Sequence, residues 1–204
     1  ENNDSLVYIP MSSGLSGSCQ SAMMLSGDYD GKVEVVNNQR ISVTQKRSVL
    51  DAMEMAQKGW TAKEIKEKLE EVRFEQSIYI MVDTLTYLAR GGRCSGVTAL
   101  LASALKLHPR INVVNGNMEV GTKYRGSLSR AMKQYLEDLK DELLQAEEEI
   151  VFITHSGIDE EILAQVKEYL EGLDYFKEIV ITRAGGVISS HCGPGTLGVL
   201  FYVK

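Results

Sequence analysis

Small hydroxyl residues and glycines are concentrated in the stretch Ser12–Ala22, which reads SSGLSGSCQSA. It lies where a predicted strand gives way to a predicted helix. Free backbone N–H groups and the helix dipole favour an anion at such a junction, and the serines add hydroxyl donors. The stretch is not a P-loop, and around Ser16 it lacks the last glycine of a nucleophile elbow. A ligand-binding loop, a structural turn and a catalytic serine, Ser13 or Ser16, all stay open.

A histidine lies in a second glycine-rich stretch, SSHCGPGTLG, which spans Ser189–Gly198. The Cys-Gly-Pro-Gly sequence after His191 predicts a stiff, tight turn that holds the imidazole in one orientation. Such a histidine can donate to a carboxylate or act on a phosphate. His108 and His155 lack comparable settings, and a buried structural histidine is the alternative for His191. Cys192 is interpreted as a small packed residue.

Two arginines in the stretch LARGGRCSG, Arg90 and Arg93, form a third candidate site. They are three residues apart, so the end of a helix would place both on one side. Arginine is suited to bidentate contact with a carboxylate or a phosphate. Arg125, which precedes a predicted helix, is expected to join them. Ordinary surface charge is the alternative.

The charge distribution supports an anionic ligand or partner. Between Arg90 and Lys133 the chain has eight Lys or Arg and one acid, whereas Gln134–Glu178 has fourteen acids and three lysines. A basic block can hold a phosphate or an acidic partner, although charge counts alone favour the simpler explanation of a solvated charged face. The net charge of −6 argues against nucleic acid as a partner.

Strands and helices are predicted to alternate along the chain, which is typical of an α/β fold with a mainly parallel sheet. In the first half we expect strands at 4–11, 32–37 and 77–82 and helices at 17–27, 46–59, 62–72 and 83–92. Thr61 and Glu64 form a capping box, and Gly59 is a helix stop. The second half of the sequence predicts an α+β layer. It contains an apolar helix at 97–107 and a hairpin at 111–121 that turns at Asn115-Gly116. Helices at 127–146 and 160–173 and strands at 149–156, 178–184 and 195–204 complete it. Glycines at 91–96 suggest a joint, which gives domains 1–92 and 93–204.

Bulk properties exclude several classes of protein. No apolar run is long enough for a transmembrane helix, and the first residues do not resemble a secretory signal. Three cysteines, Cys19, Cys94 and Cys192, fit neither a zinc site nor a disulfide framework, so we expect a reducing cytoplasm and no bound metal.

Three motifs together, SSGLSGSCQSA, DTLTYLARGGR and HCGPGTLGVLF, resemble the DegV family of bacterial fatty-acid-binding proteins. The resemblance extends from Leu6 to Lys204. It implies a two-domain α/β protein that holds one long-chain fatty acid between its domains and needs no other cofactor. The better-understood members are the FakB subunit of a fatty acid kinase. They are not catalytic alone, and they present the fatty acid carboxylate to a separate ATP-binding subunit, FakA, and carry away the acyl phosphate.

The resemblance also implies roles for individual residues. Ser13 matches the serine that hydrogen-bonds the carboxylate, and its neighbour Ser12 is expected to bind the carboxylate as well. His191 matches the histidine beside the carboxylate and the phosphoryl group. Arg90 and Arg93 match the arginines of the RGGR segment, and Arg125 matches a basic residue that meets the kinase. The family's usual N-terminal segment, with its carboxylate-binding threonine, has no counterpart here, and the NNQRISVTQKRSV stretch departs from the family's glycine-rich pattern.

We therefore expect a fatty-acid-binding protein that serves a kinase. A serine hydrolase using Ser13 or Ser16 with His191 is one alternative, although no acid partner for His191 is evident. A phosphate- or nucleotide-binding module that uses the basic block is the other, although no GxGxxG or Walker pattern supports it.

Overall fold

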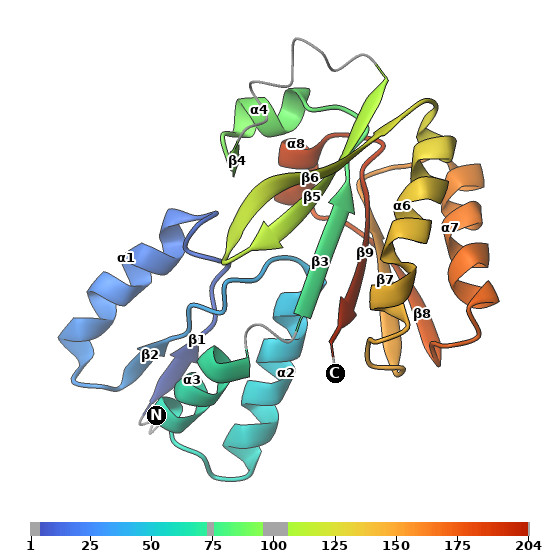
Figure 1. The fold of residues 1–204 in the computed structure, drawn as a ribbon. Coiled ribbons are helices and arrows are strands. Elements are labelled where there is room, and N and C mark those ends of the chain that lie inside the picture. The colour runs from blue at the N-terminus through green and yellow to red at the C-terminus, as the bar shows by residue number, and fades with distance from the viewer. Residues whose placement is uncertain (1–4, 73–75, 96–105, 204) are drawn as a thin grey trace. The chain divides into compact units, whose positions relative to one another are not determined.

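The computed structural model describes residues 5–72, 76–95 and 106–203, and the chain divides into two compact units (Figure 1). Unit 1 comprises Glu1–Glu75 with Asn115–Asn117, and unit 2 comprises Gln76–Val114 with Met118–Lys204. Each unit is described by itself below. The expected boundary after residue 92 differs from this division, because the strand and helix that precede it pack with the C-terminal unit.

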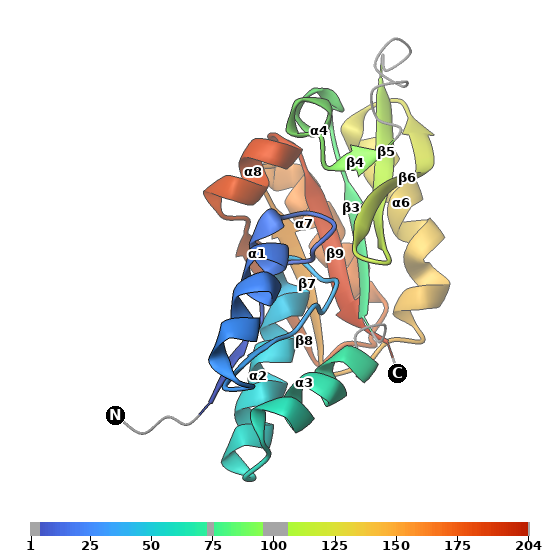
Figure 2. The same cartoon turned by 90° about the vertical axis from the view of Figure 1, so that its left-hand side faces the viewer.

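Unit 1 is built on two parallel strands, in which Leu6 pairs with Val33 and Tyr8 with Val35. Its elements are β1 (Leu6–Tyr8), α1 (Gly17–Ser26), η1 (Gly27–Tyr29), β2 (Val33–Val35), α2 (Val43–Gln57) and α3 (Ala62–Glu71). Helices α2 and α3 pack together (Figure 2). Because the strands are parallel, the loops that follow β1 and β2 leave the pair at the same edge.

Local sequence signals explain how the helices of unit 1 begin and end. Thr61 and Glu64 form the predicted capping box at the start of α3: the Thr61 side chain accepts from the Glu64 N–H, and the Glu64 carboxylate accepts from the Thr61 N–H. Gly59 follows α2 with a φ of +84°, as expected of a helix stop. Val36, Ile65 and Leu69 form a small buried core against which Val7, Ile9, Ala52 and Met55 pack.

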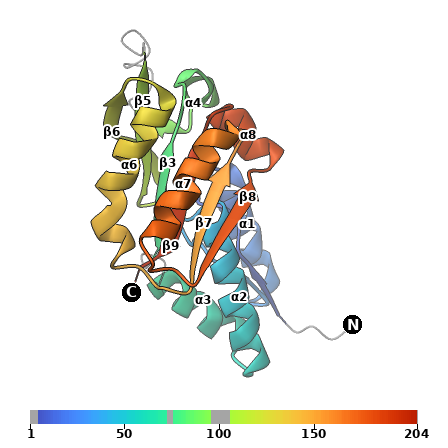
Figure 3. The ribbon, with the colours of Figure 1, turned by 90° about the vertical axis from the view of Figure 1, so that its right-hand side faces the viewer.

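Unit 2 is an α+β layer around one mixed sheet with the strand order β4-β6-β5-β3-β9-β7-β8. Its elements are β3 (Gln76–Met81), α4 (Thr86–Gly91), β4 (Cys94–Ser95), β5 (Leu107–Val114), β6 (Asn117–Arg125), α6 (Leu128–Leu143), β7 (Ile150–His155), α7 (Glu160–Gly172), β8 (Glu178–Arg183), α8 (Gly186–Cys192) and β9 (Leu197–Tyr202). Helices α6 and α7 lie together over one face of the sheet (Figure 3). Helices α4 and α8 contact each other.

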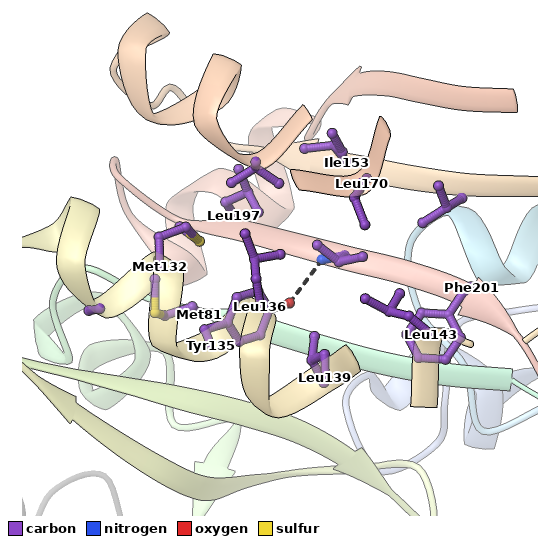
Figure 4. Close-up of a cluster of buried hydrophobic side chains, with 14 of the residues drawn as sticks. Met81, Met132, Tyr135, Leu136, Leu139, Leu143, Ile153, Leu170, Leu197 and Phe201 are labelled. Atoms are coloured by element: carbon purple, nitrogen blue, oxygen red, sulfur yellow. Dashed lines mark hydrogen bonds between the residues drawn. The ribbon is translucent and has the colours of Figure 1, made fainter. Parts of the chain in front are cut away.

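The core of unit 2 is mainly apolar, and a buried hydroxyl on α6 links the helix to two strands of the sheet (Figure 4). Tyr135 on α6 is fully buried, and its hydroxyl donates to the Tyr79 carbonyl on β3 at 2.8 Å and accepts from the Val199 N–H on β9 at 3.0 Å. Because both roles of the hydroxyl are filled, it is buried without loss of hydrogen bonding. Leu136, Leu139 and Phe201 pack around the same helix–sheet contact.

The α/β fold class is confirmed, with two corrections. β3 was expected in the mainly parallel N-terminal layer, but it pairs antiparallel with β5 and β9 in the sheet of unit 2. A short helix, α8, lies where a turn was expected around His191. The hairpin turn at Asn115-Gly116 is confirmed, with φ values of +48° and +78°. Most of the helix predicted at 97–107 lies outside the described residues, and Leu107 begins β5. None of the helices described is long and apolar enough to cross a membrane.

Candidate functional site

The serine-rich loop of unit 1 is anchored by Ser12. Its side chain is fully buried, and its hydroxyl donates to the Gly116 carbonyl at 2.7 Å while accepting from the Gly14 N–H at 3.2 Å. The Ser12 N–H donates to the Arg40 carbonyl at 3.0 Å. A hydroxyl has a single proton to donate, and that of Ser12 is already used. Ser12, expected beside Ser13 as a carboxylate ligand, therefore positions the loop in this structure.

Ser13 differs from Ser12 because its hydroxyl proton has no acceptor among the described residues. The Asn37 side chain makes two hydrogen bonds to Ser13: its Nδ2 donates to the Ser13 Oγ at 2.8 Å, and its Oδ1 accepts from the Ser13 N–H at 3.3 Å. The hydroxyl thus accepts one hydrogen bond, and no residue that the structure describes accepts its own proton, which is available for a ligand. Ser13 is half-buried, so a ligand can reach it. This arrangement suits a donor to a carboxylate.

Ser16 has a structural role. It is the N-cap of α1, and its Oγ accepts from the Ser18 N–H at 3.3 Å. A Cβ at Gly14 would lie 2.5 Å from the Asn117 Oδ1 and 2.6 Å from the Gly116 carbonyl oxygen. It is the turn at Gly116 that approaches Gly14. The loop is therefore partly a structural turn, and Ser13 is its member suited to a ligand.

His191 lies in the last turn of α8 in unit 2, not on the predicted turn, which begins one residue after the helix. Gly193 ends the helix with a φ of +79°, and its N–H donates to the Ser189 carbonyl at 2.8 Å. The imidazole is half-buried against Gly91 of α4: a Cβ at Gly91 would lie 2.3 Å from the His191 Nδ1. The imidazole therefore occupies space that is open because residue 91 has no side chain. This contact brings the RGGR motif and the HCGPG motif together.

The two arginines of the RGGR motif do not share a helical face. Helix α4 ends at Gly91, and Gly92 has a φ of +62°, which turns the chain away before Arg93. Arg93 instead folds back, and its Nη1 donates to the Gly91 carbonyl at 2.7 Å. Arg90 and Arg93 are both exposed. The motif thus places two cations within two residues of the glycine that packs on His191.

Arg125 lines a basic cleft of about 590 Å³ on unit 2. The cleft is lined by β6 and α6, and its cations are Lys123, Arg125, Arg130 and Lys133. Glu137 and Asp138 lie at the same cleft, and Asp138 accepts a hydrogen bond from the Tyr124 hydroxyl at 2.9 Å. Neither Arg90 nor Arg93 lines it, so the expectation that Arg125 would join them is not met within this cleft.

Comparison with known proteins identifies the family. Residues 1–204 match the family model described as "Uncharacterised protein, DegV family". The chain belongs to the DegV family. A DegV domain-containing protein from Deinococcus radiodurans is 30% identical over 200 residues, which cover 98% of this chain and 70% of that protein.

Solved structures of DegV proteins share the fold. A structure described as fatty acid binding of a DegV family protein from Thermus thermophilus matches with a TM-score of 0.85 and 29% identity, covering 100% of this chain and 72% of the other. DegV from Bacillus subtilis, described as a fatty acid binding protein, matches with a TM-score of 0.79 and 27% identity, covering 98% and 71%. The whole described fold of this DegV chain therefore has counterparts in solved structures.

Two other histidines of this DegV chain have structural settings. His108 is buried, with its Nδ1 3.2 Å from the Asp83 carboxylate and its Nε2 donating to the Gly126 carbonyl at 3.1 Å. His155 accepts from the Gly157 N–H at 3.3 Å, and burial and the nearby Arg183 lower its pKa. Both were set aside in favour of His191.

The cysteines are free and buried. Burial raises the pKa of Cys192 to about 11, and burial together with the Glu119 charge raises that of Cys94 to about 11. A thiol with a raised pKa is a poor nucleophile at neutral pH. The interpretation of Cys192 as a packed residue is confirmed.

Sequence reasoning missed Asn37, the residue that holds Ser13. A usable signal was present, because Asn37 is the last residue of one predicted strand and Ser13 lies just after another. Parallel neighbouring strands bring the loops at their carboxyl ends to one edge, which is where ligands of α/β sheets are usually bound. Had the first two strands been taken as direct neighbours, the polar NNQR segment would have been predicted beside the serine loop.

Proposed function

We propose that this DegV protein binds a long-chain fatty acid through its carboxylate. The observation that carries the proposal is the state of Ser13: Asn37 holds its hydroxyl, and its proton has no acceptor in the part of the chain that the structure describes. A buried carboxylate needs such donors, since an unsatisfied charged group loses several kcal/mol of hydration. The solved relatives from Thermus thermophilus and Bacillus subtilis are described as fatty-acid-binding proteins, which supports the same ligand here.

In this proposal Ser13 and His191, the two residues that match the family's carboxylate-binding residues, are the donors to the carboxylate. Ser12 supports them indirectly, since its hydrogen bond to Gly116 keeps the serine loop in place. Gly91 keeps the His191 imidazole in position. Serine and histidine bind the carboxylate without neutralising it fully, which leaves an oxygen nucleophilic enough to react.

We further propose that the bound carboxylate is presented to a separate ATP-dependent kinase subunit. A carboxylate oxygen attacks the γ-phosphorus of the ATP held by that subunit, the bond to the ADP oxygen breaks, and an acyl phosphate and ADP result. On its own the DegV chain catalyses nothing in this scheme; it binds and orients the fatty acid. Arg90, Arg93 and Arg125, which are exposed, would meet the kinase or the new phosphate, because cations offset the charge of a transferring phosphoryl group.

Extraction of the purified protein followed by mass spectrometry tests the ligand. We expect a long-chain fatty acid in the wild type and a markedly lower occupancy in Ser13→Ala and in His191→Ala. Ser13→Ala should weaken fatty acid affinity by roughly 1–3 kcal/mol, the scale of one lost hydrogen bond to a charged group. Ser18→Ala, which removes an exposed hydroxyl from the same segment, is the matched control and should keep wild-type occupancy. A nucleotide as the extracted ligand, or wild-type affinity in both site variants, would overturn the proposal.

A reconstituted kinase assay at two ionic strengths tests the partner. Arg93→Ala and Arg125→Ala should slow acyl phosphate formation while fatty acid occupancy stays intact, and the difference from wild type should shrink at high salt, where charge steering is screened. Lys140→Ala removes an exposed cation from α6 outside the basic cleft and serves as the control. Unchanged turnover in both arginine variants would leave the cations without a role in docking.

A further inference from the structure

The loop that follows β2 contains a buried arginine, Arg40, for which the described residues provide no counter-charge. Arg40 is 5% exposed, and its Nε is buried with no hydrogen-bond partner among the described residues. No ion pair of Arg40 is found within the described part of the chain either. Burial lowers the pKa of Arg40 to about 10, which still leaves the guanidinium protonated at neutral pH. A buried, unpaired cation is costly, so a partner of opposite charge would stabilise it strongly.

A second unsatisfied donor lies two residues earlier. Asn38 is fully buried, and its Oδ1 accepts from the Arg40 N–H at 3.0 Å. Its Nδ2 has no acceptor among the described residues. The loop therefore carries buried N–H donors on Asn38 and Arg40 for which the structure, in the residues it describes, provides no oxygen acceptor. Buried donors are nearly always paired in native proteins, and an oxyanion is the acceptor that satisfies a guanidinium best.

These donors belong to the same pair of loops as Ser13. The Arg40 carbonyl accepts from the Ser12 N–H, and Asn37 makes its two hydrogen bonds to Ser13. Both loops leave the parallel strands β1 and β2 at their carboxyl ends. The unsatisfied donors thus lie in the segment that holds the proposed carboxylate donor in place, at the edge of the sheet where α/β proteins usually bind ligands.

We propose that Arg40 and Asn38 form an oxyanion-binding site, and that its occupant is the negatively charged head group of the bound lipid. This inference rests on the proposed function and adds to it a charged contact that the motifs did not indicate. Free phosphate is an oxyanion, as a lipid head group is, and could satisfy the same donors. The experiment below therefore distinguishes the two ligands. Arg40 supplies the positive charge, and Ser13 supplies a neutral donor.

The test compares a charged and an uncharged lipid of equal chain length. Palmitate and hexadecanol are titrated into lipid-free wild type, Arg40→Met and Lys46→Met, where Lys46 is an exposed cation of α2 and serves as the control. We expect wild type and Lys46→Met to prefer palmitate. Arg40→Met should lose about ten-fold or more of that preference, the scale of a charge-assisted hydrogen bond, with hexadecanol binding unchanged.

Thermal unfolding of the lipid-free proteins guards against a folding defect. Arg40→Met should unfold at or above the wild-type temperature, because it removes an uncompensated buried charge, and Arg40→Gln is the second variant should Arg40→Met fail to fold. An unchanged palmitate preference in the Arg40 variants would overturn the inference. A second result would also overturn it: inorganic phosphate stabilises wild type but not Arg40→Met, and the palmitate preference is unchanged. The occupant of the site would then be free phosphate. If wild type binds neither lipid, the proposed function itself fails, and the head-group assignment fails with it.

Discussion

Replacing Gly91 with alanine should move the His191 imidazole. The new Cβ would lie 2.3 Å from the His191 Nδ1, 3.1 Å from its Cε1 and 3.3 Å from its Cγ, whereas ordinary contacts begin near 3.4 Å. The ring, or helix α4, must therefore retreat by about 1 Å, because packed interiors have little free space. The backbone itself tolerates alanine, since Gly91 is not among the residues with positive φ.

The size of the effect should differ between stability and function. Alanine favours a helix over glycine by roughly 0.5–1 kcal/mol, and overpacking costs about 1–3 kcal/mol, so the net loss of stability should stay below about 3 kcal/mol. A displacement of about 1 Å at a reacting group can cost on the order of 100-fold in rate. We expect acyl phosphate formation with the kinase partner to fall about 10- to 100-fold in Gly91→Ala, with the protein still folded.

Three measurements check this reasoning. Chemical shifts of the His191 ring report its displacement without any assumption about function, and calorimetric titration of fatty acid and the coupled kinase assay report its consequence. Gly186→Ala is the matched control, because Gly186 lies on the same helix as His191 and a Cβ there meets nothing within 4 Å. Unshifted ring signals in Gly91→Ala would refute the contact. Shifted signals with wild-type binding and turnover would instead refute the role of His191.

Three further outcomes are expected. Ser12→Ala should destabilise the fold by about 1–3 kcal/mol in urea unfolding, because it leaves the Gly116 carbonyl without its 2.7 Å hydrogen bond. Asn37→Ala should weaken fatty acid binding about 3- to 10-fold, since Ser13 loses its partner, while Ser18→Ala should not. The free energy of unfolding should fall as pH rises from about 9 to about 11, because the thiols of Cys94 and Cys192 stay protonated in the folded chain while those of the unfolded chain ionise. Urea unfolding at pH 8, 9, 10 and 11 measures this fall, and Cys192→Ala should make it shallower.

Elements with strong local signals could be predicted from the sequence. The capping box at Thr61 and Glu64, the glycine stop at Gly59 and the turn at Asn115-Gly116 each depend on residues within a few positions of one another, and all three were predicted correctly. The partner strands of β3 could not be predicted in this way. Its apolar run suits a parallel or an antiparallel neighbour equally well, and its pairing with β9 joins residues such as Ile78 and Leu200 that are far apart in sequence.

The same distinction explains what could be predicted of the candidate site. Residue type identified Ser13, His191 and the arginines as groups suited to a carboxylate or a phosphate, but it could not tell Ser12 from Ser13. The difference between these neighbours lies in their partners. Ser12 donates to Gly116, which lies far along the chain, whereas Ser13 accepts from Asn37 and donates to none of the residues described. Whether a hydroxyl can serve a ligand thus depends on which hydrogen bonds the fold has already filled. By the same reasoning, Arg40 became a candidate only when the structure showed it to be buried without an acceptor among the described residues.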